Sequence, residues 1–158
     1  MNELPTDITV ILDEEKRFIT NHAEFPALHD TLKLNGVGQT TKYDYIVDVN
    51  RKYCLFNRIT YHQRIFTSIT LLRLDIDTKP HQNPDGKKIS GTHLHVYRHG
   101  FGDGWAYELT DPALCEIWPE FDFSVFTQGD LVNKFYAFAN LCNFTNRVMF
   151  EVPIDVSG

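Results

Sequence analysis

Four segments in the middle of the chain alternate between apolar and polar residues, and this period of two constrains the fold more than any other feature. Each of them places apolar side chains on one face of an extended chain and polar side chains on the other. These segments cover residues 43–49, 53–62, 67–76 and 92–98. A fifth, shorter segment of this kind covers residues 105–109. We predict antiparallel strands that share one buried and one polar face.

Helical signals flank this central region. Residues 12–34, interrupted by Pro26, are predicted to be helical, and residues 110–118 begin with an N-cap followed by proline. Apolar residues at helical spacing predict a longer helix over residues 128–142, and residues 148–152 could add a final strand. The predicted fold is α+β: an antiparallel β-meander of about five strands, with an N-terminal helix and C-terminal helices packed on one face.

The chain has 158 residues, which predicts a single domain over 1–158. We find no apolar run of membrane-spanning length and no signal peptide. Cys54, Cys115 and Cys142 are widely separated and odd in number, which favours reduced thiols over a disulfide framework. These features together predict a cytoplasmic protein with no membrane association.

The net charge of −6 argues against broad binding to duplex DNA, which needs a basic surface. The charge is unevenly distributed, however. Residues 50–73 carry five basic side chains and no acidic one, whereas residues 103–130 carry acidic side chains and no Lys or Arg. The basic segment could bind an anion, and the acidic segment could neutralise it or meet a basic partner protein.

The shared alternation predicts that polar residues from four separate strands gather on one face of the sheet. We interpret this face as a candidate site, and the alternative is a solvated surface with weak cross-strand ion pairs. The residues predicted to lie on it are Asp48, Asn50, Arg58, His62, Arg73, Asp75, His93 and His95.

Two imidazoles at positions i and i+2 of a strand can converge on one metal ion. His93 and His95 have this spacing, and His81 or Asp75 could supply a third ligand. Cupin-type sites add a glutamate a few residues later, and here no glutamate appears until Glu108. We therefore expect no cofactor and no stoichiometric zinc, with a metal-binding protein kept as one alternative.

A second alternative is a metal-independent phosphodiesterase or ribonuclease of the toxin type. Such enzymes use two acid–base groups, often histidines, and a cation that neutralises the phosphorane. His81, His93 and His95 are the candidate acid–base groups, and Arg73 is the candidate cation. The further candidate ligand-binding residues outside the polar face are Asn83, Arg98 and Trp105.

Several motifs between Tyr45 and Leu109 carry a resemblance to known proteins. They include Asn83-Pro84-Asp85-Gly86, the stretch from His93 to Arg98, and Trp105-Ala106-Tyr107. With these motifs the chain resembles a family of small uncharacterised bacterial and prophage proteins. The resemblance implies a role in defence, counter-defence or toxicity, and it implies no particular reaction.

The resulting functional expectation is a phage- or prophage-type protein that acts by binding. It would inhibit a host or phage nucleic-acid machine as an anti-defence protein, or recognise the phosphate of a nucleotide or nucleic acid. A concave pocket lined by the polar-face residues would favour the enzyme alternative. A flat polar face together with an exposed acidic patch over residues 103–130 would favour an inhibitor of a protein partner.

Overall fold

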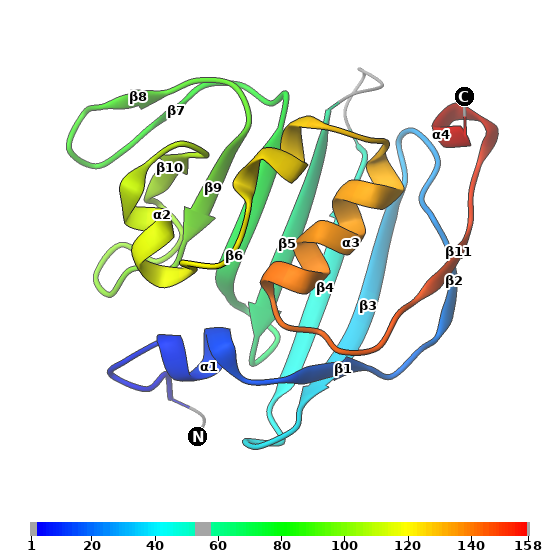
Figure 1. The fold of residues 1–158 in the computed structure, drawn as a ribbon, viewed down its shortest axis with the longest axis horizontal. Helices are drawn as coiled ribbons and strands as arrows, with labels where there is room; N and C mark the ends of the chain where they lie inside the picture. The colour runs from blue at the N-terminus through cyan, green and yellow to red at the C-terminus, as the bar shows by residue number, and fades with distance from the viewer. Residues whose placement is uncertain (1–2, 53–57, 158) are drawn as a thin grey trace.

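The structure is a computed structural model, which describes residues 3–52 and 58–157 (Figure 1). Within these residues, seven strands form one antiparallel sheet in the order β1-β3-β4-β5-β6-β9-β10. The α+β class is confirmed, with seven strands in the sheet where about five were predicted. The strands are β1 Lys16–Phe18, β3 Thr31–Gly38, β4 Asp44–Asn50, β5 Ile59–Ile65, β6 Ile69–Ile76, β9 His93–Val96 and β10 Ala106–Glu108.

Two small strand pairs lie outside this sheet. Strand β2, His22–Glu24, pairs in parallel with β11, Met149–Glu151, and so joins the two ends of the chain. Strands β7, His81–Gln82, and β8, Lys88–Ile89, form a hairpin within the predicted loop 77–91. The predicted final strand over residues 148–152 is therefore present, although it does not extend the main sheet.

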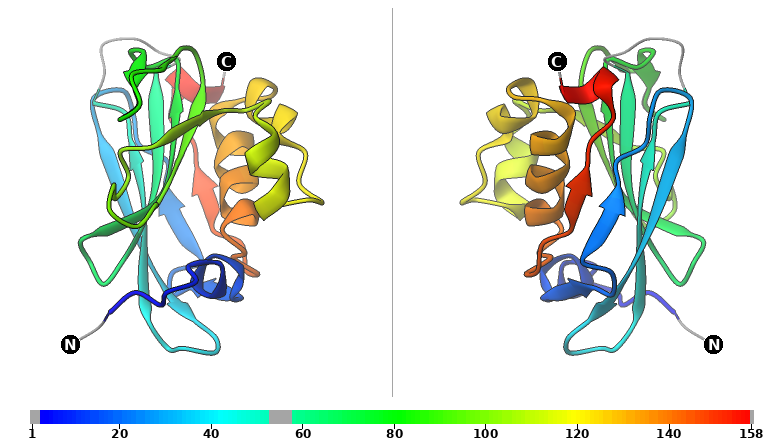
Figure 2. Two further views of the ribbon diagram at one scale, coloured as in Figure 1. Left: turned by 90° about the vertical axis from the view of Figure 1, so that its left-hand side faces the viewer. Right: turned by 90° about the vertical axis from the view of Figure 1, so that its right-hand side faces the viewer.

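Helices cover one face of the sheet, as predicted. Figure 2 shows α2 and α3 on the same side, with the other face of the sheet turned away from them. The first turns of α2, η1 and α3 are capped by the side chains of Asp111, Asp122 and Asp130, which accept hydrogen bonds from backbone N–H groups. The helices are α1 Thr9–Asp13, α2 Pro112–Ile117, the 3₁₀ helix η1 Phe123–Thr127, α3 Leu131–Leu141 and α4 Ile154–Ser157. No helix among the described residues is long and apolar enough to cross a membrane.

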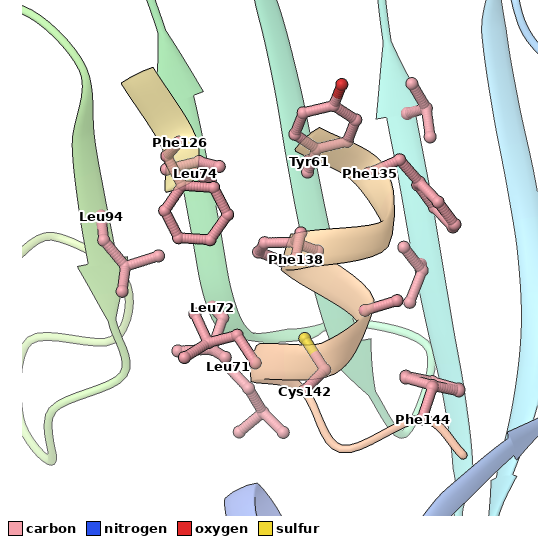
Figure 3. Close-up of a cluster of buried hydrophobic side chains, with 14 of the residues drawn as sticks. Tyr61, Leu71, Leu72, Leu74, Leu94, Phe126, Phe135, Phe138, Cys142 and Phe144 are labelled. Carbon is pink, nitrogen blue, oxygen red and sulfur yellow. The ribbon is translucent and has the colours of Figure 1, made fainter. Parts of the chain in front are cut away.

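The core lies between α3 and the sheet (Figure 3). Phe135 and Phe138 of α3 pack against the ring of Tyr61, with ring centroids 6.1 and 5.9 Å away. Leu74 and Leu94 extend the same fully buried layer along β6 and β9. Because successive strand residues point to opposite faces, the intervening polar residues must lie on the face away from α3.

The predicted helix over residues 12–34 is wrong, because most of this segment is extended. Within this segment, only its first two residues are helical, because they form the end of α1 at Asp13. Strands β1, β2 and part of β3 follow. Within β3, Leu32 and Leu34 are the more buried residues and Lys33 is exposed, which is a strand period. Pairing of β3 with β4 satisfies the backbone hydrogen bonds that a helix would otherwise have satisfied locally.

Other boundaries differ by a few residues. The predicted strand 53–62 is observed as β5 from Ile59 to Ile65, and residues 53–57 lie outside the described residues. The predicted strand 67–76 begins at Ile69, because Phe66 and Thr67 adopt positive φ angles of 53° and 67° in the turn before it. The helix predicted over 128–142 is confirmed as α3, while the 3₁₀ helix before it was not predicted.

Candidate functional site

Two rows of polar residues run across the sheet on the face away from α3. In the first row, Asp48 lies opposite His62, His62 opposite Arg73, and Arg73 opposite His95. The second row contains, in order across the strands, Asn50, Thr60, Asp75 and His93. The prediction that these strands share one polar face is confirmed for every predicted member except Arg58, which precedes β5.

A cavity of about 470 Å³ lies over these rows. This volume falls within the range of small-molecule sites. Thr60 was not predicted, although its register position between Asn50 and Asp75 follows from the same alternation. Thr31 was missed because its segment was predicted to be helical. The cavity is lined by Thr31, Asp48, Asn50, Thr60, His62, Arg73 and Asp75.

Arg64, which sequence reasoning also missed, holds the Asp48 carboxylate at one side of this pocket. Its Nε and Nη2 atoms donate to the two oxygens of Asp48 at 2.7 and 3.0 Å. His62 lies beside this pair, with Nδ1 3.6 Å from Asp48 Oδ2 and Nε2 2.6 Å from Thr70 Oγ1. Burial lowers the pKa of His62 below its ordinary value of 6.5, although Asp48 opposes this effect. We therefore expect a neutral imidazole near pH 7.

Arg73 connects the pocket to the histidines. Its Nε donates to Asp75 Oδ1 at 3.2 Å, and its Nη1 donates to Asp103 Oδ2 at 2.8 Å. Its Nη2 lies 3.0 Å from Nε2 of His95. These three contacts use three of the five N–H groups of the guanidinium, which is partly exposed at the pocket wall.

His93 and His95 are fully buried, which the sequence did not predict for residues of a polar sheet face. Nδ1 of His93 lies 2.7 Å from the carbonyl oxygen of Gly91, and Nδ1 of His95 lies 2.7 Å from that of Asp103. A carbonyl oxygen only accepts, so each Nδ1 carries a hydrogen and donates it. The Nε2 atoms of both rings therefore face Asp75, at 3.3 and 3.2 Å from its Oδ2.

The surroundings of Asp75 and His95 determine the charges of these two side chains. Burial raises the pKa of Asp75, but the two imidazoles and the Arg73 guanidinium outweigh burial and hold the pKa below its ordinary value of 3.8. Burial lowers the pKa of His95, and Arg73 acts in the same direction, whereas Asp75 opposes them. An ionised carboxylate thus faces at least one neutral imidazole.

His81 and Asn83 lie beside this group and fasten the β7–β8 hairpin. Nε2 of His81 donates to the carbonyl oxygen of Gly104 at 2.7 Å, and the His81 ring is 4.6 Å from that of His95. The Asn83 side chain is buried against the backbone of Ala106. These predicted site residues therefore hold the cover over the histidines and do not line the pocket.

Three other predicted site residues lie outside the pocket. Nε of Arg58 donates to the carbonyl oxygen of Asp77 at 2.8 Å, beyond the start of β5. The guanidinium carbon of Arg98 lies 4.0 Å from the centre of the Trp105 ring. Arg98 and Trp105 therefore contact each other and are not among the residues that line the pocket.

The acidic segment 103–130 is largely used within the fold. Asp111, Asp122 and Asp130 cap helix N-termini, and Asp103 pairs with Arg73. Glu108, Glu116 and Glu120 are exposed, as are the two capping residues Asp122 and Asp130. The segment is therefore explained mainly by helix capping and by one ion pair with the polar face.

Comparison with known proteins identifies the family. No curated protein and no solved structure matches the chain. The sequence profile of the family of unknown function DUF6978 matches residues 6–144, which includes the whole pocket and the buried histidines. The chain belongs to this family of unknown function, DUF6978.

Proposed function

We propose that the protein binds a nucleotide-type phosphodiester in the pocket over the polar rows. The observation that carries this proposal is a lining made entirely of polar side chains, with one guanidinium that keeps two N–H groups without a recorded partner among the described residues. Guanidinium groups recognise phosphate oxygens through paired hydrogen bonds. Arg73 is therefore the proposed phosphate anchor.

The charge balance of the pocket favours a singly charged phosphate. Arg64 neutralises Asp48, whereas Arg73 at the other side pairs with both Asp75 and Asp103, so this group carries one negative charge in excess. A phosphate monoester carries about −1.5 to −2 charges near pH 7 and would be repelled by Asp75. A phosphodiester carries a single charge, so Arg73 can hold it with less repulsion.

The remaining lining residues suit the sugar of such a ligand. Thr31, Thr60 and Asn50 offer hydroxyl and amide groups, and the carboxylates of Asp48 and Asp75 accept hydrogen bonds from sugar hydroxyls. No Phe, Tyr or Trp is among the lining residues that the structure describes, so base stacking is not part of the proposal. The proposed contacts are to the ribose and the phosphodiester.

Binding explains the site better than hydrolysis. A phosphodiesterase needs two acid–base groups in reach of its substrate. His93 and His95 are fully buried, and of the described histidines only His62 lines the pocket. The concave pocket meets the condition stated above for the enzyme alternative, but the burial of His93 and His95 leaves it with a single histidine, so it supports a small-ligand site. The acidic segment used for helix capping gives less support to an inhibitor that mimics nucleic acid.

The wider role in this proposal follows the motif resemblance. In a cytoplasmic protein of phage or prophage type, the pocket would act in anti-defence by withholding a nucleotide from a host or phage nucleic-acid machine. This setting makes two predictions: the gene should lie in phage-derived DNA, and a pull-down from host lysate should recover a nucleotide with the protein. A genomic context without phage genes would contradict the role without affecting the pocket chemistry.

Calorimetric titration tests the ligand class. The wild-type protein, in buffer with EDTA, is titrated with the RNA dinucleotide ApA, with AMP and with ribose. We expect ApA to bind most tightly. Arg73→Gln should weaken the affinity for ApA by about 10- to 100-fold, which corresponds to the loss of one or two charge-assisted hydrogen bonds. Asn50→Ala, which removes a lining side chain without changing charge, should also weaken binding.

Arg17→Gln is the matched control, because it removes the same charge from an exposed position of β1. This control variant should bind ApA like the wild type. Absence of ApA binding would overturn the proposal, and so would equal affinities of the wild type and both pocket variants. Tighter binding of AMP than of ApA would contradict the assignment of a phosphodiester.

A further inference from the structure

We propose that Asp75, His93 and His95 form a binding site for a divalent transition-metal ion of the Zn²⁺ type. The site would use Oδ2 of Asp75 and Nε2 of each histidine. These three atoms lie within 4.8 Å of one another, and all three residues are buried. Asp75 also lines the pocket of the proposed phosphodiester ligand, whereas the buried His93 and His95 do not.

The spacing of the donor atoms fits a metal. Oδ2 of Asp75 lies 3.3 Å from Nε2 of His93 and 3.2 Å from Nε2 of His95. Two ligands at about 2.0–2.1 Å from a tetrahedral zinc ion are separated by about 3.3–3.4 Å. Two nitrogen donors and one carboxylate, with room for water or substrate as a fourth ligand, are the donor set of many catalytic zinc sites.

The Nε2 atom of His93 gives the strongest independent indication. The side chain is fully buried, and this nitrogen has no hydrogen-bond partner among the residues that the structure describes. Since Nδ1 donates its hydrogen to the carbonyl of Gly91, Nε2 is the ring atom that faces the Asp75 carboxylate. Buried polar atoms are rarely left without partners, and a ring nitrogen beside an anionic oxygen is stabilised by a cation between them, which can be a proton or a metal ion.

Both imidazoles are held by hydrogen bonds to backbone carbonyls, as the imidazoles of metal-bound histidines commonly are. Metal-bound histidines commonly donate their other N–H group to a backbone carbonyl or a carboxylate, which fixes the tautomer. His93 donates to Gly91 in this way, and His95 donates to Asp103. The sequence expectation of no bound metal depended on the lack of a cysteine cluster and of a clear carboxylate third ligand, and the pairing of β6 with β9 places Asp75 opposite His93.

One existing contact has to change when a metal binds. Nη2 of Arg73 lies 3.0 Å from Nε2 of His95 and occupies part of the space that the ion needs. Arg73 can release His95 and still hold Asp75 Oδ1 and Asp103 Oδ2. Arg73 and the metal therefore compete for the same nitrogen, and removal of the guanidinium should tighten metal binding.

The test is metal binding by the full chain in the absence of any nucleotide. The protein is stripped with a chelator, dialysed and titrated with Zn²⁺ by calorimetry, with metal content measured afterwards by elemental analysis. We expect one Zn²⁺ per chain and a higher melting temperature in its presence. A Co²⁺-loaded sample should show the visible absorption of tetrahedral coordination. A folded protein that takes up no metal would overturn the proposal.

Substitutions then locate the ion. Asp75→Asn, His93→Gln and His95→Gln should each weaken Zn²⁺ binding by more than about 100-fold, because each removes a direct ligand. Arg73→Gln should strengthen it. Circular dichroism checks that each variant folds, and Asp75→Asn, which keeps the side-chain shape, remains decisive if the buried histidine variants unfold.

His22→Gln and His62→Gln are the matched controls, since His22 is exposed in β2 and His62 lies opposite Arg73, and neither is among the three donors. Both should bind Zn²⁺ like the wild type. Unchanged affinity of Asp75→Asn, or an equal loss in the two controls, would place any bound zinc elsewhere and overturn this assignment. Because the ApA titrations contain EDTA, failure of one proposal leaves the result of the other unaffected.

Discussion

The side chain of Asn83 forms two hydrogen bonds with the backbone of Ala106. It satisfies the N–H and C=O groups of Ala106 as a neighbouring strand would. Nδ2 of Asn83 donates to the Ala106 carbonyl at 2.9 Å, and the Ala106 N–H donates to Oδ1 at 2.8 Å. This contact anchors the β7–β8 hairpin to β10. It helps to explain why His93 and His95 are buried on a sheet face that is polar elsewhere.

The first prediction concerns this anchor. Asn83→Ala should leave a buried N–H group and a buried carbonyl without partners, at a cost of roughly 1–3 kcal/mol each if water does not replace the side chain. Hydrogen exchange should speed up at Ala106 and in residues 81–89. Gln82→Ala is the control, because Gln82 is exposed on the same hairpin. Equal exchange in both variants would show that the hairpin is held by other contacts.

The second prediction concerns the pH dependence of stability. Burial raises the pKa of Glu14, but hydrogen bonds from Thr41, Tyr45 and Thr40 outweigh burial and hold the pKa below its ordinary value of 4.5. A lowered carboxyl pKa contributes stability above the unfolded value, and this contribution is lost as the pH falls through the folded value. The free energy of unfolding should therefore decrease on acidification below about pH 4.5.

Urea denaturation at pH 7 and pH 4 measures this effect. Glu14→Gln should be less stable than the wild type at pH 7, and the difference should shrink at pH 4. Glu15→Gln changes the same charge at the exposed neighbouring position and should show no such pattern. A constant difference between Glu14→Gln and the wild type across this range would mean that packing, not charge, accounts for the loss.

The polar face could be predicted from the sequence because period-two alternation is a local property. Asp48, His62, Arg73 and His95 lie on one face wherever the strands pair in register, and they do. The burial of His95 could not be predicted in this way. It depends on the hairpin and on the 99–105 loop, whose positions are set by contacts such as that of His81 with Gly104.

The N-terminal third could not be assigned because its strands are short and irregular. Strands β1 and β2 contain three residues each, and their pairing depends on partners far away in the sequence. Lys16 illustrates the problem. It is fully buried, and its ammonium group donates to the carbonyl oxygens of Leu12, Glu14 and Cys142, which no local pattern predicts.

The third prediction concerns Arg51, which ties the end of β4 to the C-terminal segment. Its side chain is fully buried, with Nη1 2.9 Å from the carbonyl of Pro26 and 3.0 Å from Oδ2 of Asp155. Arg51→Ala should destabilise the protein by about 3–5 kcal/mol, as expected when one partner of a buried ion pair is removed. Lys52→Ala, at the exposed next position, should change the midpoint of chemical denaturation little.

The fourth prediction separates the core from the polar face. From the sequence, Arg73→Ala and His95→Ala would both be expected to cost little stability, as surface positions do. His95 is not a surface residue, because it is fully buried and forms a hydrogen bond with the backbone of Asp103. The expectation of a small cost is therefore wrong for His95. We now expect His95→Ala to cost about 1–3 kcal/mol through the carbonyl that it leaves without a donor.

Leu74→Ala provides the reference for a core substitution, because Leu74 belongs to the buried hydrophobic core and has no exposed surface. It should cost about 2–5 kcal/mol through the cavity that it creates. Arg73→Gln keeps the stem of a partly exposed side chain, so it should melt closest to the wild type. Melting curves that instead rank Arg73→Gln below Leu74→Ala would show that the Asp75, Asp103 and His95 contacts of Arg73 stabilise the fold as well as the site.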